Sequence, residues 1–220
     1  MIQLTPEECR VLGTLVEKAQ TTPNQYPLTL NALTNGCNQR NNRDPLLELS
    51  EDKVLEAVDA LKAKSLAREA IMTGSRVNKF KHAMRDGLSI NVAEMAVLSE
   101  LLLRGPQSAG ELRTRCDRLV PPGTTPGVGS PEAVLQVLDG LMKRDEPLVQ
   151  RLERRSGERS ERYAQRLCPD LHALDGASEH GSAPGRAITD AGGPDESDRL
   201  AGVLARLEAL EARVARLEER

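Results

Sequence analysis

Aromatic side chains are almost absent from this chain of 220 residues, which has no Trp, one Phe and two Tyr. A hydrophobic core must therefore be built from Leu, Val and Ala, and such a core favours helices over a β-sandwich. No apolar run reaches the length needed to cross a membrane, and the N-terminus lacks a signal-peptide pattern. We therefore expect a cytoplasmic protein that has no membrane partner.

Cysteine and histidine are few and widely spaced. The cysteines are Cys9, Cys37, Cys116 and Cys168, with no Cys-x-x-Cys pair, and the first three fall on apolar helix positions. We interpret them as reduced thiols in the core of a cytosolic protein. The three histidines have no ligand spacing with the cysteines, so the sequence predicts no metal site and no cofactor.

Motifs of known catalytic sites are also missing. No glycine-rich loop follows a predicted strand, and neither Gly-x-Ser-x-Gly nor His-Glu-x-x-His occurs. The carboxylates of Glu7, Glu8 and Glu17 are explained by helix starts and solvated helix faces. Acid–base catalysis by paired carboxylates needs a cleft, and the predicted architecture offers no deep one. We therefore predict that the chain is not an enzyme.

The stretch of residues 50–81 has the pattern of a helix followed by a two-stranded hairpin. The apolar spacing is that of a helix with one buried stripe, formed by Val54, Leu55, Val58, Leu61 and Leu66. Apolar residues then alternate with a period of two around Thr73-Gly74-Ser75, where glycine permits a tight turn. A helix followed by a basic hairpin is the second half of a winged helix-turn-helix.

The same pattern returns at an offset of about 80–86 residues, which indicates a duplicated domain. SEDKVLEAVDAL at residues 50–61 aligns with SPEAVLQVLDGL at residues 130–141. Capping boxes are predicted for Thr5 with Glu8, Asn91 with Glu94, and Ser108 with Glu111. The predicted fold class is therefore α+β, mostly α, with two tandem winged helix-turn-helix domains at residues 1–86 and 87–170.

The C-terminal residues have a different composition. Residues 171–198 are rich in Gly, Ala, Ser, Asp and Pro, and we predict a flexible linker. Residues 199–220 carry a heptad seam typical of a coiled coil, formed by Leu200, Val203, Leu207, Leu210, Val214 and Leu217. This seam predicts a homodimer. The alternatives are a single amphipathic helix that docks on the body, or a frayed tail.

The loop after the second predicted helix contains Asn38-Gln39-Arg40-Asn41-Asn42-Arg43, four amides and two arginines in succession. Arg40 and Arg43 are suited to grip a phosphate or the carboxylate of a partner. Alternatively, the amides bond the backbone of their own loop, which is a common role of Asn in turns.

Double-stranded DNA is the partner that the hairpins favour. We predict contacts from this loop and both hairpins, at Arg40, Arg43, Arg76, Lys79, Lys81, Arg159 and Arg162. The first hairpin also carries Arg68 and Arg85, close to Glu69 and Asp86. The charges of hairpins also serve solubility and protect strand edges, so this pattern has an alternative explanation.

The third helix of each predicted domain is poorly suited to serve as a recognition helix in the major groove of DNA. Its solvent face would show Asp52, Glu56 and Asp59 in the first domain, and carboxylates repel phosphates. The hairpins and the loop would then supply most of the attraction. The alternative function is a protein–protein interaction module that binds no nucleic acid.

Several segments resemble one bacterial family. The run EKAQTTPNQYPLTLNALTNGCNQRNNRDPLLELSE, together with GSRVNKF and LSELLLRGPQSAGELR, is similar to the YceH family, also called UPF0502. The resemblance covers residues 4–167 and implies two winged-helix domains in tandem, but it implies no catalytic or binding residues. The linker and the heptad tail look like additions outside the family pattern.

Overall fold

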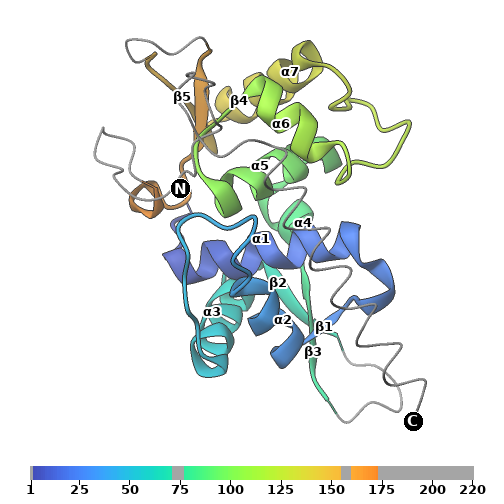
Figure 1. Ribbon diagram of the computed structural model, residues 1–220, viewed down its shortest axis with the longest axis vertical. Coiled ribbons are helices and arrows are strands. Elements are labelled where there is room, and N and C mark those ends of the chain that lie inside the picture. The colour runs from blue at the N-terminus through green and yellow to red at the C-terminus, as the bar shows by residue number, and fades with distance from the viewer. Residues whose placement is uncertain (1, 71–76, 155–159, 173–220) are drawn as a thin grey trace, which may run out of the picture. The chain divides into compact units, whose positions relative to one another are not determined.

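The computed structural model of the chain describes residues 2–70, 77–154 and 160–172. Within these ranges the chain is a mixed α+β protein with seven α-helices and two small antiparallel sheets, which confirms the predicted class (Figure 1). Arg76, Arg159, the tip of each hairpin, most of the predicted linker and the whole heptad seam lie outside the described residues.

The first half contains, in chain order, α1 (Pro6–Thr21), the 3₁₀ turn η1 (Pro23–Gln25), β1 (Leu28–Thr29), α2 (Leu30–Cys37), α3 (Glu51–Ala63), β2 (Ala67–Ala70) and β3 (Lys79–His82). The short helix α4 (Met84–Leu88) leads into the second half. This half contains α5 (Val92–Arg104), β4 (Gln107–Ser108), α6 (Ala109–Cys116), α7 (Pro131–Met142), β5 (Val149–Leu152), β6 (Arg162–Gln165) and the 3₁₀ turn η2 (Pro169–Leu171).

Each half has a three-stranded sheet in which the last strand lies in the middle. The order is β1-β3-β2 in the first sheet and β4-β6-β5 in the second. Leu28 pairs with Phe80 in the first sheet, and Gln107 pairs with Tyr163 in the second. The order of elements and the order of strands in the first half therefore recur in the second half.

The predicted capping boxes are confirmed at the starts of α1, α5 and α6. The backbone N–H of Thr5 donates to the Glu8 carboxylate at 2.9 Å, and the N–H of Glu8 donates to the Thr5 hydroxyl at 3.2 Å. Asn91 and Glu94 make the same exchange at 2.8 and 2.9 Å. These bonds satisfy N–H groups that have no partner inside the helix, so the local sequence fixes where each helix begins.

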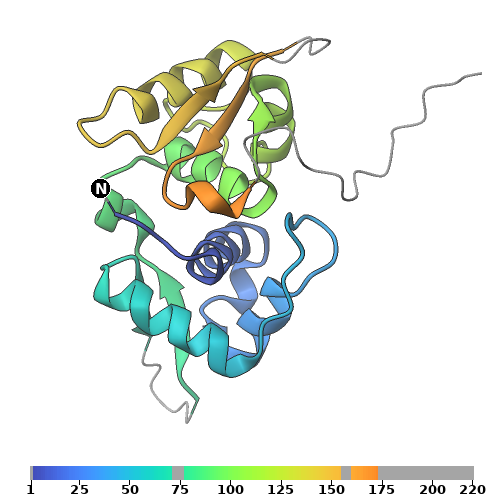
Figure 2. The ribbon, with the colours of Figure 1, turned by 90° about the vertical axis from the view of Figure 1, so that its left-hand side faces the viewer.

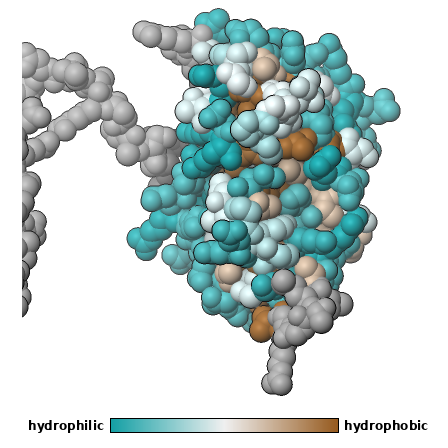
Figure 3. Space-filling view, turned by 90° about the vertical axis from the view of Figure 1, so that its right-hand side faces the viewer, coloured by the Kyte–Doolittle hydropathy of each residue, from teal (hydrophilic) through white to brown (hydrophobic). Residues whose placement is uncertain are grey.

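The helix α1 packs against α5 on one side and against α3 on another, and Figure 2 shows α1 almost end-on between them. Gly13 allows a close approach of α1 and α5, because a Cβ at this position would lie only 2.7 Å from Cγ of Leu103. Apolar residues of both halves form one core. On the face drawn in Figure 3 the surface is mostly hydrophilic, and apolar residues show only in small patches.

The predicted boundary between residues 86 and 87 falls inside α4. Leu171 and His172, the first two residues of the predicted linker, are both buried. His172 Nε2 lies 2.7 Å from the backbone oxygen of Asp44, so the folded body extends at least to this residue. Among the described residues, no helix combines the length and the apolar character that crossing a membrane requires.

Candidate nucleic-acid interface

Three cations share the outer face of the first sheet. In the register of β2 and β3, Arg68 lies directly opposite Lys81. Lys79 precedes Lys81 by two residues and therefore lies on the same face, while Phe80 between them is buried in the core. Arg68 and Lys81 are exposed and Lys79 is half-buried. The strand pairing thus assembles a basic strip from residues of two strands.

This basic strip is only partly neutralised. Arg68 forms an ion pair with Asp86 at 3.3 Å, and both side chains are exposed. Within the described ranges, neither Lys79 nor Lys81 has an ion-pair partner. Like charges directly opposite each other destabilise a sheet, and a bound anion would relieve this repulsion. The strip is therefore a suitable site for phosphate groups.

The second sheet lacks an equivalent strip. In the aligned register Gln150 replaces Arg68, and Ala164, which is buried, replaces Lys81. Arg151 is exposed but lies 3.4 Å from the carboxylate of Glu161. Arg162 is a half-buried residue of β6, next to the buried Tyr163. The two predicted wings are therefore unequal, and the first has the stronger positive charge.

The prediction that Arg43 contacts DNA is wrong. The side chain of Arg43 is 0% exposed, and its guanidinium donates to the Glu17 carboxylate at 2.6 and 3.4 Å. It also donates to the backbone oxygen of Gly36 at 2.9 and 3.2 Å. The assignment of Glu17 to a solvated face is wrong for the same reason, since Glu17 is only 4% exposed. Arg43 is a structural residue of the first half.

The pKa of Glu17 reflects this pair. Burial alone would raise the pKa of the Glu17 carboxyl, but the hydrogen bond and the charge of Arg43 outweigh burial and hold the pKa below its usual value. Glu17 is therefore ionised at neutral pH, and Arg43 has a full charge partner inside the fold.

The amides of the same loop also serve the fold. Asn38 donates from Nδ2 to the backbone oxygen of Leu49 at 2.8 Å and accepts from the Leu49 N–H at 2.9 Å. The N–H of Asp44 donates to the backbone oxygen of Leu103 in α5 at 2.8 Å. The loop therefore joins the two halves, and the alternative in which an amide bonds its own loop is confirmed for Asn38. Arg40, in contrast, is exposed, and within the described ranges it has no ion-pair partner.

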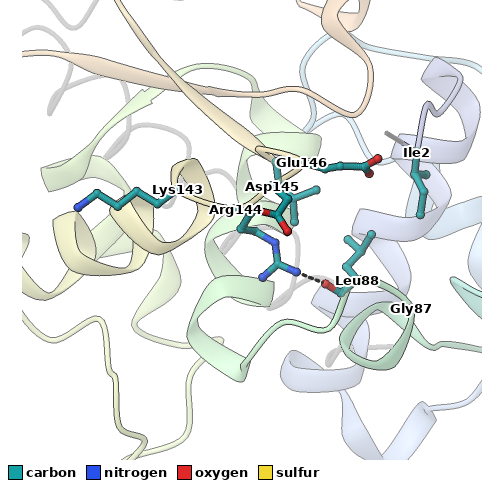
Figure 4. Close-up of a pocket in the computed structure, with 8 residues that line it drawn as sticks. Ile2, Gly87, Leu88, Lys143, Arg144, Asp145 and Glu146 are labelled. Atoms are coloured by element: carbon teal, nitrogen blue, oxygen red, sulfur yellow. Dashed lines mark hydrogen bonds between the residues drawn. The ribbon is translucent and has the colours of Figure 1, made fainter.

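A cavity of about 500 Å³ lies where the α7–β5 loop approaches α4 (Figure 4). Its cations are already engaged. Arg144 points to α4 and donates to the backbone oxygen of Leu88 at 2.7 Å, whereas Lys143 points away and pairs with Asp139 at 2.7 Å. We therefore interpret this cavity as a gap between packed elements. No cluster of His, Cys, Asp and Glu that could hold a metal ion occurs in the described part of the chain.

Arg68 lies in the first predicted hairpin but is not among the predicted contacts. Alternation with a period of two places Lys79 and Lys81 on one face of β3. The strand register, which pairs Arg68 with Lys81, adds Arg68 to the same face.

Known proteins match most of the chain. Residues 4–158 match the model of a family described as "Protein of unknown function, DUF480". A UPF0502 protein of Geotalea daltonii is 51% identical over 164 residues, which cover 74% of this chain and 72% of that protein. The UPF0502 protein GSU0233 of Geobacter sulfurreducens is 48% identical over 174 residues, covering 78% of this chain and 76% of that protein.

The alignment with another relative extends into the C-terminal residues. The UPF0502 protein Bcen2424_5610 of Burkholderia cenocepacia is 44% identical over 216 residues, which cover 97% of this chain and 88% of that protein. An alignment of this length includes the predicted linker and most of the heptad seam. The family model ends at residue 158, so the linker and the heptad tail lie outside it, as predicted.

Proposed function

The chain belongs to the UPF0502 family, and we propose that it binds double-stranded DNA through the outer face of its first sheet. The partner is the phosphate backbone of the duplex, and regulation of transcription is the role that such binding would serve. The single observation that carries the proposal is the basic strip of Arg68, Lys79 and Lys81.

The order of elements supports this proposal. Each half runs helix, strand, helix, helix, strand, strand, and its last strand lies between the other two. We infer that both halves are winged helix-turn-helix domains, in which β2–β3 and β5–β6 are the wings. A wing can follow the phosphate backbone while its cations neutralise phosphates and release counterions.

The charge of α3 supports a binding mode in which the wing dominates. The helix α3 contains Glu51, Asp52, Glu56 and Asp59 but only Lys53 and Lys62, so its net charge is −2. Lys53 pairs with Glu56 at 2.7 Å, and Lys62 pairs with Asp59 at 3.0 Å. Little positive charge remains on α3 for a phosphate, so the attraction must come from the strip.

Binding of the full chain to a labelled duplex of random sequence tests this proposal. We expect binding at low salt that weakens steeply and log-linearly as salt rises, with little preference for sequence. Failure to bind any duplex at low salt would end the proposal.

A second candidate function is protein–protein interaction, and a repeated leucine favours it. Leu55 in α3 and Leu135 in α7 occupy equivalent positions in the two halves, and they are 37% and 43% exposed. The prediction that Leu55 belongs to the buried stripe of its helix is therefore wrong. Four large apolar residues in the described ranges are exposed, and these are two of them. A single exposed leucine needs no explanation, but from its recurrence at the equivalent position of a repeated helix we infer a contact surface.

The negative charge of α3 indicates the kind of protein surface that would bind there in this second function. Helical spacing places Glu51, Asp52 and Asp59 three or four positions from Leu55, and the net charge of α3 is −2. We infer a protein partner that offers an apolar side chain ringed by Lys or Arg. Such a partner would bury the leucine and pair with the acidic residues at the rim.

The double variant Leu55→Asp/Leu135→Asp tests the second function. Nuclease-treated cell extract is passed over the immobilised full chain, and the stoichiometry of any retained protein is measured. We expect a stoichiometric basic partner on the wild type that is lost, by at least about tenfold, on the double variant. The control is Gln136→Asp, next to Leu135 in α7, which should retain the partner. Equal retention by all three proteins would contradict the proposed surface.

A further inference from the structure

The carboxyl group of Glu100 lies inside the fold, in the second half of α5. Its side chain is 0% exposed, and both of its oxygen atoms are buried. Among the described residues, no group donates a hydrogen bond to either oxygen. A buried carboxylate normally accepts such bonds, so an ionised Glu100 would be poorly stabilised at this position.

Glu100 faces the contact between the two halves. Gly13 of α1 lies against Leu103 of α5, so closely that a Cβ on Gly13 would come within 2.7 Å of Leu103 Cγ. Glu100 precedes Leu103 by about one helical turn, and residue 17, also a glutamate, follows Gly13 by about one turn. Residues one turn apart share a helix face, so the carboxyl groups of Glu17 and Glu100 lie at the same interface.

The nearby arginines compensate a charge on Glu100 only in part. Arg104, one turn further along α5, has its Nε 3.0 Å from a carboxylate oxygen of Glu100, but this contact lacks the alignment of a hydrogen bond. Arg115 of α6 donates instead to the side-chain oxygen of Gln107 at 2.6 Å. Arg118, just after α6, is exposed, so solvent screens its charge. Glu100 therefore has one imperfect charge partner among the described residues.

The other elements packed against α5 are α4, α7 and β6. In α4, Asp86 pairs with Arg68 at 3.3 Å, and in α7, Asp139 pairs with Lys143 at 2.7 Å. Arg162 of β6 acts on the carboxylate at the start of α6. The main charges that act on Glu100 come from its own helix, α1, and the end of α6, and they belong to Arg104, Glu17, Arg118 and Arg115.

The acidity of Glu100 agrees with this geometry. Burial disfavours the charged carboxylate and raises the pKa of Glu100 above its usual value, and the negative charge of Glu17 acts in the same direction. The charge of Arg104 opposes the rise but does not cancel it. Glu100 therefore keeps its proton at a pH where exposed glutamates are already ionised.

We propose that Glu100 is a pH-sensitive switch in the contact between the two halves. With its proton bound, Glu100 is a neutral acid, and α1 packs closely against α5. When the proton leaves, a carboxylate without a hydrogen-bond donor remains between the helices, close to the negative charge of Glu17. Hydration of this carboxylate requires α1 and α5 to separate, so rising pH loosens the contact.

Rising pH is expected to destabilise the folded chain through this group. Because folding raises the pKa of Glu100, the folded chain binds this proton more tightly than the unfolded chain does. The resulting stabilisation is complete below the unfolded pKa of about 4.3 and is lost as pH rises through the folded pKa. The folding equilibrium constant should fall about tenfold for each pH unit that separates these two pKa values.

The variant Glu100→Gln tests the switch, because glutamine has nearly the same size as glutamic acid but does not ionise. The stability of the full chain is measured by chemical denaturation between about pH 5 and pH 9, where Glu17 stays ionised. We expect the wild type to lose stability relative to Glu100→Gln as pH rises. Hydrogen–deuterium exchange at the alkaline end should be faster in α1 and α5 of the wild type than in those of the variant.

The control is Glu56→Gln, which replaces an exposed carboxylate of α3 that pairs with Lys53 at 2.7 Å. Its difference in stability from the wild type should stay constant over the same pH range. The fit of a glutamine amide in the core gives Glu100→Gln a constant offset as well, so only the part of its difference that changes with pH reports the switch.

A measurement on the wild-type chain keeps the test independent of how well a variant folds. Carbon-13 NMR of the chain labelled at its glutamate carboxyl groups follows Glu100, assigned through its own backbone signals. We expect the Glu100 signal to change from acid to carboxylate at a higher pH than the Glu56 signal. The proposal is overturned if the two titrate together, or if the stability difference between wild type and Glu100→Gln does not change with pH.

Discussion

Replacing Arg43 with alanine is expected to lower the free energy of unfolding by about 3–5 kcal/mol, because the change leaves the Glu17 carboxylate buried without a charge partner. It also removes the donors to the backbone oxygen of Gly36. For a folded body of this size, such a loss lowers Tm by about 10 °C. Thermal and chemical denaturation of the full chain measure the effect.

The loss of stability caused by Arg43→Ala is expected to be smaller at low pH. In the wild type the pKa of Glu17 is held below its usual value, so the ion pair adds stability above the unfolded pKa of Glu17. This stability is lost as pH falls through the lower, folded pKa. The difference between wild type and variant should therefore shrink as pH falls below about 4.

The control for this change is Arg40→Ala in the same loop. Arg40 is exposed, and within the described ranges it has no ion-pair partner. We therefore expect a change within about 0.5 kcal/mol, as for most surface substitutions. The account of the loop is wrong if Arg43→Ala is as stable as Arg40→Ala.

Replacing both lysines of the basic strip is expected to have the largest effect on DNA binding. Each phosphate contact contributes about 0.9 to the slope of log K against log salt, so Lys79→Gln/Lys81→Gln should reduce the slope by about 1.8. At moderate salt this corresponds to an affinity about 10–100-fold lower, equally for all sequences. Fluorescence anisotropy over a series of salt concentrations measures both quantities.

A control with the same change in net charge separates the strip from overall electrostatics. Lys143 and Arg151 are exposed cations paired with Asp139 at 2.7 Å and with Glu161 at 3.4 Å. Lys143→Gln/Arg151→Gln also removes two positive charges, but we expect its salt slope to equal that of the wild type. If both double variants lose the same slope, binding depends on net charge and the strip has no special role.

The local features of the fold could be predicted from the sequence. The cap at Thr5 and the buried stripe of Val54, Val58 and Leu61 depend on residues within a few positions of each other. Helix starts and periodicity are properties of short segments, so one sequence is enough to find them. The recurrence of these segments also predicts the repeated order of elements.

The errors concern contacts between distant segments. Arg43 looks like an anion-binding residue in a loop of amides, because its partner Glu17 is 26 positions away and has the spacing of a helix surface. Periodicity indicates which face of an element is buried, but it does not identify the residue that covers that face.

The most direct test of the central claim is hydrogen–deuterium exchange of the full chain with and without a short DNA duplex at low salt. The basic strip predicts that the duplex slows exchange in β2 and β3, around Arg68, Lys79 and Lys81, and leaves β5 and β6 unchanged. Slower exchange in α3 or in the second sheet, with none in β2 and β3, would contradict the claim.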